Sequence, residues 1–124
     1  MAGNYKDLMV WRESILLVPE IYARLKRFPP EEKFELCSQI RRAAVSVPAN
    51  IAEGQGRSYR KSFLQHLRIA KGSLAELHTL FVISEQLGYV SPAELEEIEA
   101  AIERIAKPLH GLITKVTQDV KAGE

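Results

Sequence analysis

A polar stripe runs through an otherwise apolar stretch of this 124-residue chain, SQIRRAAVSVPANIAEGQGR at positions 38–57. At about 100° per residue, its members fall within an arc of about 80° on one side of a helix. They are short or directional and alternate with Ala and Val, unlike the Glu and Lys mixture of a solvated face. The members are Arg42, Ser46, Asn50, Glu53 and Arg57.

Such a face is expected to pack against another helix or subunit rather than to carry out a reaction. A buried Arg or Glu is costly without an opposite charge. We therefore expect Glu53 to form an ion pair with Arg60. In an antiparallel hairpin Arg42 lies about a turn from Glu76, which predicts a second ion pair. Both pairs would set the register between helices.

Positive charge is concentrated in the middle of the chain, although the formal net charge is only +1. The segment 40–72 is rich in Lys and Arg, and Glu53 is its only acidic residue. Phosphate binding needs dense Lys and Arg on one face, and an aromatic ring beside them can stack on a base. The sequence therefore predicts an RNA- or DNA-binding hairpin. Its residues are Arg41, Arg57, Tyr59, Arg60, Lys61, Arg68 and Lys71.

Negative charge follows further along the chain, because residues 73–103 contain Glu but no Lys or Arg. Two alternatives to nucleic-acid binding follow. The basic residues could pair with the protein's own acidic helices, or an acidic helix face could meet a basic protein, which would make the chain a protein–protein scaffold. That face consists of Glu94, Glu96, Glu97, Glu99 and Glu103.

Residue patterns typical of enzymes are missing. A di-iron bundle needs Glu three residues before His, but Phe63, Ala75 and Lys107 occupy those positions before the three histidines. The single cysteine, Cys37, excludes an internal disulfide and is expected to be a small buried apolar residue. Gly72 is expected to let two helices approach. We predict no cofactor, no metal and no enzymatic activity.

Apolar spacing predicts one domain, 1–124, with four helices at about 8–27, 31–54, 59–87 and 92–120. The fourth begins with Ser91, Pro92 and Glu94 in the order of a capping box. Short connections make these helices antiparallel neighbours. The predicted fold class is therefore all-α, an up-down-up-down four-helix bundle.

The first helix has more apolar residues than one buried stripe requires. Its heptad seam consists of Leu8, Trp11, Ile15, Val18, Tyr22 and Leu25. Leu17 and Ile21 lie off this seam and suggest a second interface, so we expect a homo-oligomer. The N-terminus lacks the layout of a signal peptide, and apolar runs are too short for a membrane span. A cytoplasmic location without membrane partners is expected.

Three segments carry a resemblance to a known protein family: DLMVWRESILLVPEIY, FPPEEKFELCSQIRRAAVSVPANIAEGQGR and FLQHLRIAKGSLAELHTLFVISEQLGYV. They resemble the four-helix-bundle proteins encoded by intervening sequences of bacterial 23S ribosomal RNA genes. The resemblance implies an antiparallel bundle that assembles as a ring-shaped homopentamer. It also implies kinship with accessory proteins of diversity-generating retroelements, which help a reverse transcriptase and bind nucleic acid. Those relatives are strongly basic, whereas this chain is nearly neutral.

Overall fold

The computed structural model describes residues 4–57 and 59–123 and contains no strand within these ranges. Two short 3-10 turns, Tyr5–Asp7 and Pro30–Glu32, precede the first two helices. The prediction of an all-α chain with four helices is confirmed. The helices are α1 Met9–Leu25, α2 Leu36–Gly56, α3 Arg60–Gln86 and α4 Pro92–Gly123.

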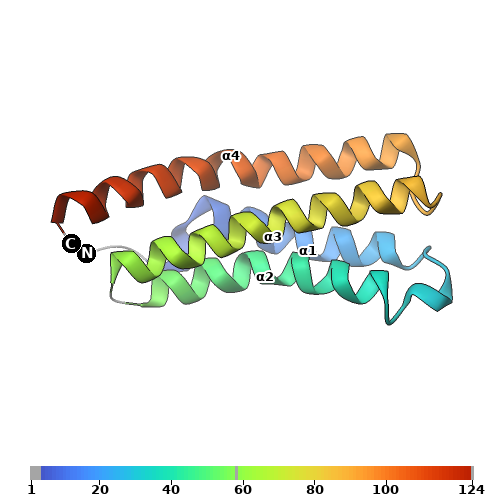
Figure 1. Ribbon diagram of the computed structural model, residues 1–124, viewed down its shortest axis with the longest axis horizontal. Helices are drawn as coiled ribbons and strands as arrows, with labels where there is room; N and C mark the ends of the chain where they lie inside the picture. Colours follow the sequence, from blue (N-terminus) through green and yellow to red (C-terminus); the bar gives the residue numbers. More distant parts are fainter. Residues whose placement is uncertain (1–3, 58, 124) are drawn as a thin grey trace.

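The four helices form an elongated antiparallel bundle (Figure 1). Each helix contacts two neighbours in the cyclic order α1, α2, α3, α4. The end of α2, the beginning of α3 and the end of α4 lie at one end of the bundle. The connections from α1 to α2 and from α3 to α4 lie at the other end. The two ends of the bundle therefore carry different residues.

The second, third and fourth helices each carry a seam of apolar residues at helical spacing, and these three seams form most of the core. Burial of these side chains is the main favourable contribution to folding. Phe81, Ile40, Ile51, Leu67 and Leu77 are among its fully buried members. The remaining buried members of the three seams are Cys37, Ala44, Val47, Phe63, Ala70, Leu74, Ile98, Ile102, Ile105, Leu109 and Val116.

The packing of α1 differs from the prediction. Ile15 and Tyr22 of the heptad seam are 40% and 41% exposed, whereas Leu17 and Ile21 are buried in the core. Ser14 lies on the buried stripe and is also inaccessible to solvent. Its hydroxyl donates a 2.8 Å hydrogen bond to the carbonyl of Trp11, which satisfies the polar group without water. The exposed side of α1 therefore carries Ile15 and Tyr22, whereas the other four seam residues are buried or partly buried against the core.

The start of α2 also differs from the prediction, because this helix begins at Leu36 instead of Glu31. The 3-10 turn Pro30–Glu32 occupies the expected first turn. Phe34, which lies within the range predicted for the second helix, is 80% exposed. The carboxylate of Glu32 accepts a hydrogen bond from the backbone N–H of Leu36 at 3.4 Å, which supports the later start.

Gly54 lies inside α2 at a point where this helix closely approaches α3. A Cβ atom at this position would lie 2.7 Å from Cβ of His66 and 3.1 Å from Cδ1 of Phe63. The predicted role of Gly72 is wrong, since a Cβ there would have nothing within 4 Å. The spacing of α2 and α3 therefore depends on Gly54.

Candidate functional site

The middle of the polar stripe lies between α2 and α3, where it forms a chain of hydrogen bonds. Oγ of Ser46 accepts hydrogen bonds from the Ser73 hydroxyl at 2.8 Å and from the Asn50 amide at 2.9 Å. Oδ1 of Asn50 lies 3.0 Å from Nδ1 of His66. We call Ser46, Asn50, His66 and Ser73 the polar seam. Its hydrogen bonds determine which turns of the two helices face each other.

Neither predicted ion pair forms among the residues that the structure describes. Arg60 instead lies 3.2 Å from Asp119 of α4. Glu53 accepts a 2.9 Å hydrogen bond from Arg57 on its own helix. The Arg57 guanidinium, with a smaller contribution from His66, holds the pKa of Glu53 below its ordinary range.

The second predicted pair fails because its two members stay in solvent. Arg42 donates a 3.0 Å hydrogen bond to Ser38 one turn earlier on α2. Glu76 is exposed and forms no ion pair within the described ranges. Exposed charges gain little from being paired, so the ends of the stripe do not need the partners that burial would require.

The predicted nucleic-acid-binding residues fall into two groups. The first group consists of cations that bind other groups of the same chain. Arg57 and Arg60 contact carboxylates as described above. Arg41 donates a 2.8 Å hydrogen bond to the carbonyl of Lys33. Arg41 lines a hollow with Tyr22 of α1, whereas Lys71 lines a groove between α3 and α4 on another side of the bundle. The structure therefore does not bring Arg41 together with the rest.

The second group consists of exposed cations on α3. Lys61, Arg68 and Lys71 form no ion pair or side-chain hydrogen bond with any residue for which the structure gives a position. They lie within an arc of about 80°, with spacings of roughly 10 and 5 Å along the helix axis. Tyr59, which is 69% exposed, lies directly before this helix. We call Lys61, Arg68 and Lys71 the α3 cation row.

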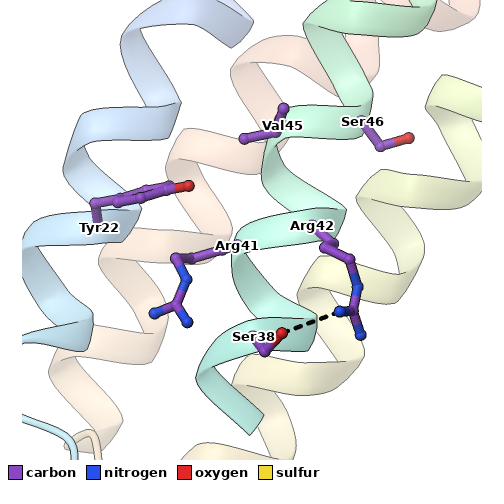
Figure 2. A pocket seen from close by; sticks show the side chains of 6 residues that line it. All are labelled: Tyr22, Ser38, Arg41, Arg42, Val45 and Ser46. Atoms are coloured by element: carbon purple, nitrogen blue, oxygen red, sulfur yellow. Dashed lines mark hydrogen bonds between the residues drawn. The ribbon is translucent and has the colours of Figure 1, made fainter. Parts of the chain in front are cut away.

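A shallow hollow of about 510 Å³ crosses the outer side of α2 (Figure 2). Tyr22 of α1 and Arg41 and Val45 of α2 lie toward the boundary between these helices, whereas Ser46 points away from it. A neighbouring hollow of about 350 Å³ continues along α1. We call this surface the α1–α2 face and define it by Ile15, Val18, Tyr22, Arg41 and Val45.

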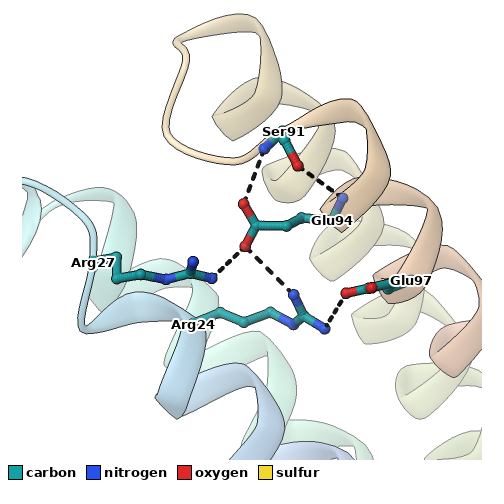
Figure 3. Close-up of polar contacts among 5 residues, drawn as sticks. All are labelled: Arg24, Arg27, Ser91, Glu94 and Glu97. Atoms are coloured by element: carbon teal, nitrogen blue, oxygen red, sulfur yellow. Dashed lines mark hydrogen bonds and ion pairs between the residues drawn. The ribbon is translucent and has the colours of Figure 1, made fainter.

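Arg24 and Arg27 connect α1 to the beginning of α4 (Figure 3). Arg24 lies 3.5 Å from Glu94 and 3.0 Å from Glu97, and Arg27 contacts Glu94 as well. The predicted capping box is present, with Oγ of Ser91 3.0 Å from the N–H of Glu94. The backbone N–H of Ser91 and the two guanidinium groups hold the pKa of Glu94 below its ordinary range.

The acidic face predicted to meet a basic protein is thus partly occupied by the chain itself. Besides Glu94 and Glu97, Glu99 is engaged, because Nε2 of His78 lies 2.8 Å from its carboxylate. Glu96 and Glu103 have no ion pair in the part of the chain that the structure describes.

Among the described residues, no three His, Cys, Asp or Glu side chains lie close enough to hold a metal ion. Cys37 is buried as predicted, and burial raises the pKa of its thiol. Over the same residues, every helix is too short or too polar to cross a membrane.

The fold is similar to a crystal structure from Bacteroides thetaiotaomicron, described as a protein of unknown function from the S23 ribosomal protein family. The two chains are 27% identical with a TM-score of 0.80, over 88% of this chain and 98% of that one. The family model described as 23S rRNA-intervening sequence protein matches residues 6–111. The chain belongs to this family. We find no match among curated proteins.

Membership in the 23S rRNA-intervening sequence protein family confirms the resemblance seen in the sequence. Neither the description of this family nor that of the crystal structure names a reaction. The function of this intervening sequence protein therefore has to be inferred from its own surfaces.

Two residues of the polar seam were missed by the sequence analysis. His66 and Ser73 lie seven residues apart and thus on one side of α3. Ser46 and Asn50 lie four residues apart on α2, so the two pairs match in an antiparallel hairpin. A search for short polar partners on the facing helix, instead of opposite charges, would have found both.

Proposed function

We propose that this protein is a non-enzymatic, oligomeric helical bundle that binds the backbone of RNA or DNA through the α3 cation row. The observation that supports this is the absence of any acidic partner for Lys61, Arg68 and Lys71 within the described ranges. Three cations on one side of a helix can each neutralise a phosphate and release a counterion. Tyr59 adds a ring on which an unpaired base can stack.

Oligomerisation matters for this proposal because a single row makes few contacts. We propose that the α1–α2 face joins subunits into the ring-shaped pentamer that the family resemblance implies. Tyr and Arg are enriched in protein interfaces, and the face combines them with exposed aliphatic side chains. Repeating the cation row once per subunit would raise the affinity through simultaneous contacts.

The test is the affinity for a fluorescent structured RNA and a DNA duplex at about 50 and 200 mM salt. The wild-type protein should bind and lose affinity by orders of magnitude between these concentrations if several rows are engaged. Lys61→Gln combined with Arg68→Gln removes two phosphate contacts. The plot of log affinity against log salt should then be shallower by about one unit per lost contact.

A matched control removes the same charge from the other end of the bundle, with Lys26→Gln and Lys33→Gln. Both side chains are exposed there, and the control should bind as the wild type does. Absence of binding at about 50 mM salt would overturn the proposal. Equal losses in the two double variants would show that only the total charge matters.

A protein–protein scaffold is the second candidate, favoured by the exposed apolar side chains of Ile15 and Tyr22 on α1. An apolar protein interface depends little on salt, whereas phosphate contacts weaken steeply. A partner whose binding survives 200 mM salt and both double variants would favour the scaffold.

A further inference from the structure

A small groove of about 210 Å³ lies between α3 and α4, on the side of α3 away from the polar seam. Its floor consists of Leu74, Ile102 and Leu109, which are buried members of the core. Ala75 and Ala106 leave the space above this floor unfilled. The complete lining is Lys71, Leu74, Ala75, His78, Ile102, Ala106, Leu109 and His110.

The two ends of the groove differ in charge. At one end, His78 is engaged by the carboxylate of Glu99 at 2.8 Å. At the other end lie Lys71 and His110, whose side chains have no hydrogen bond or ion pair with the rest of the described chain. The carboxylate of Glu99 would repel an anion, so only the Lys71–His110 end favours one.

The length of the groove follows from the helices that line it. Seven residues of α3 separate its ends at Lys71 and His78, which corresponds to roughly 10 Å. An apolar floor of this length suits an extended alkyl chain better than a compact polar molecule. One end can therefore hold a charged head while the floor covers the tail.

We propose that this groove binds a medium-length alkyl carboxylate, with its head between Lys71 and His110 and its tail on Leu74, Ile102 and Leu109. The proposal does not require nucleic-acid binding, although Lys71 belongs to both the groove and the α3 cation row. The apolar floor supplies affinity, and the cationic end supplies the preference for an acid over a neutral alcohol.

Calorimetric titration of the full chain with acetate, butanoate, hexanoate and octanoate tests the proposal. Each added pair of methylene groups should raise the affinity by roughly tenfold while the tail still lies within the groove. Octanol, which has the same tail without the charge, should bind at least threefold more weakly than octanoate. Equal affinities for acetate and octanoate would overturn the proposal.

Variants locate the binding within the groove. Ala75→Leu adds a side chain at an exposed lining position and should weaken octanoate binding at least tenfold. Ala106→Leu fills the groove from the opposite helix and should have the same effect. Ala100→Leu is the matched control, since Ala100 is exposed on α4 outside the groove. Circular dichroism checks that each variant retains its helices.

Two further variants test the charged end. Lys71→Gln should weaken octanoate binding about three- to tenfold while leaving octanol unchanged. Lys61→Gln with Arg68→Gln should leave octanoate binding intact, so failure of the nucleic-acid proposal is distinguishable from failure of this one. Octanoate binding that persists unchanged in both Ala75→Leu and Ala106→Leu would overturn the assignment.

Discussion

At the scale of single residues, Gly54 decides how closely α2 and α3 pack. Gly54→Ala places a methyl group 2.7 Å from Cβ of His66, and overpacking of this kind costs about 1–3 kcal/mol. We expect a corresponding loss in the free energy of unfolding, measured by urea denaturation.

Gly72→Ala is the control for this prediction, because the same methyl group meets nothing within 4 Å. Replacing an unconstrained glycine inside a helix should stabilise the protein by up to about 1 kcal/mol. Equal effects of the two substitutions would contradict the role assigned to Gly54. The sequence could not separate these glycines, since both lie within helices and only the distance to the facing helix differs.

At the scale of elements, the ion pairs and cap at the beginning of α4 tie this helix to α1. The pKa of Glu94 is lowered in the folded state, and it returns to its ordinary value in the unfolded chain. The carboxylate therefore contributes its full stability above the unfolded pKa, and this contribution is lost as the pH falls through the folded pKa.

Glu94→Gln should accordingly lower the free energy of unfolding at pH 7 by roughly 1 kcal/mol. The difference from the wild type should shrink on acidification toward about pH 3, because the wild-type carboxyl then becomes neutral too. Urea denaturation across this pH range measures both effects. Glu96→Gln, at an exposed position, should show neither, and a difference that grows in acid would contradict the assignment.

The four helices differ in how well the apolar pattern of the sequence predicts which side is buried. The apolar seams of α2, α3 and α4 are largely buried, as their helical spacing indicates, whereas Phe34 before α2 is exposed. In α1 two stripes one residue apart compete, and the buried one contains Ser14. When the buried stripe of a helix is chosen by hydropathy alone, a polar residue such as Ser14 counts against the stripe that contains it. The hydrogen bond from the Ser14 hydroxyl to the carbonyl of Trp11 allows this residue to be buried. That hydrogen bond can be recognised only in the folded helix.

At the scale of the whole molecule, the α1–α2 face should control assembly. A pentamer would have a mass of about 70 kDa, compared with 14.0 kDa for the chain. Tyr22→Glu places a charge within the proposed interface and should reduce the mass measured by light scattering. Leu87→Glu alters an exposed apolar residue at the end of α3 and should leave the mass unchanged.

A wild-type protein that scatters light as a monomer would contradict the assembly, whatever the variants do. The sequence carries only part of this information. Heptad spacing predicts that helices pack side by side, and the composition of α1 indicates an excess of apolar surface. The number of subunits depends on the angle between neighbouring copies. Residue spacing within one chain does not specify this angle.

Because Cys37 is buried, its reactivity with a thiol reagent reports local opening of the bundle. A thiol with a raised pKa that is 3% exposed reacts slowly while the bundle is closed. Because it is the only cysteine in the chain, all modification by a thiol reagent must come from molecules in which the beginning of α2 has separated from the core. The labelling rate therefore measures how often that end of the bundle opens, without any substitution in the chain.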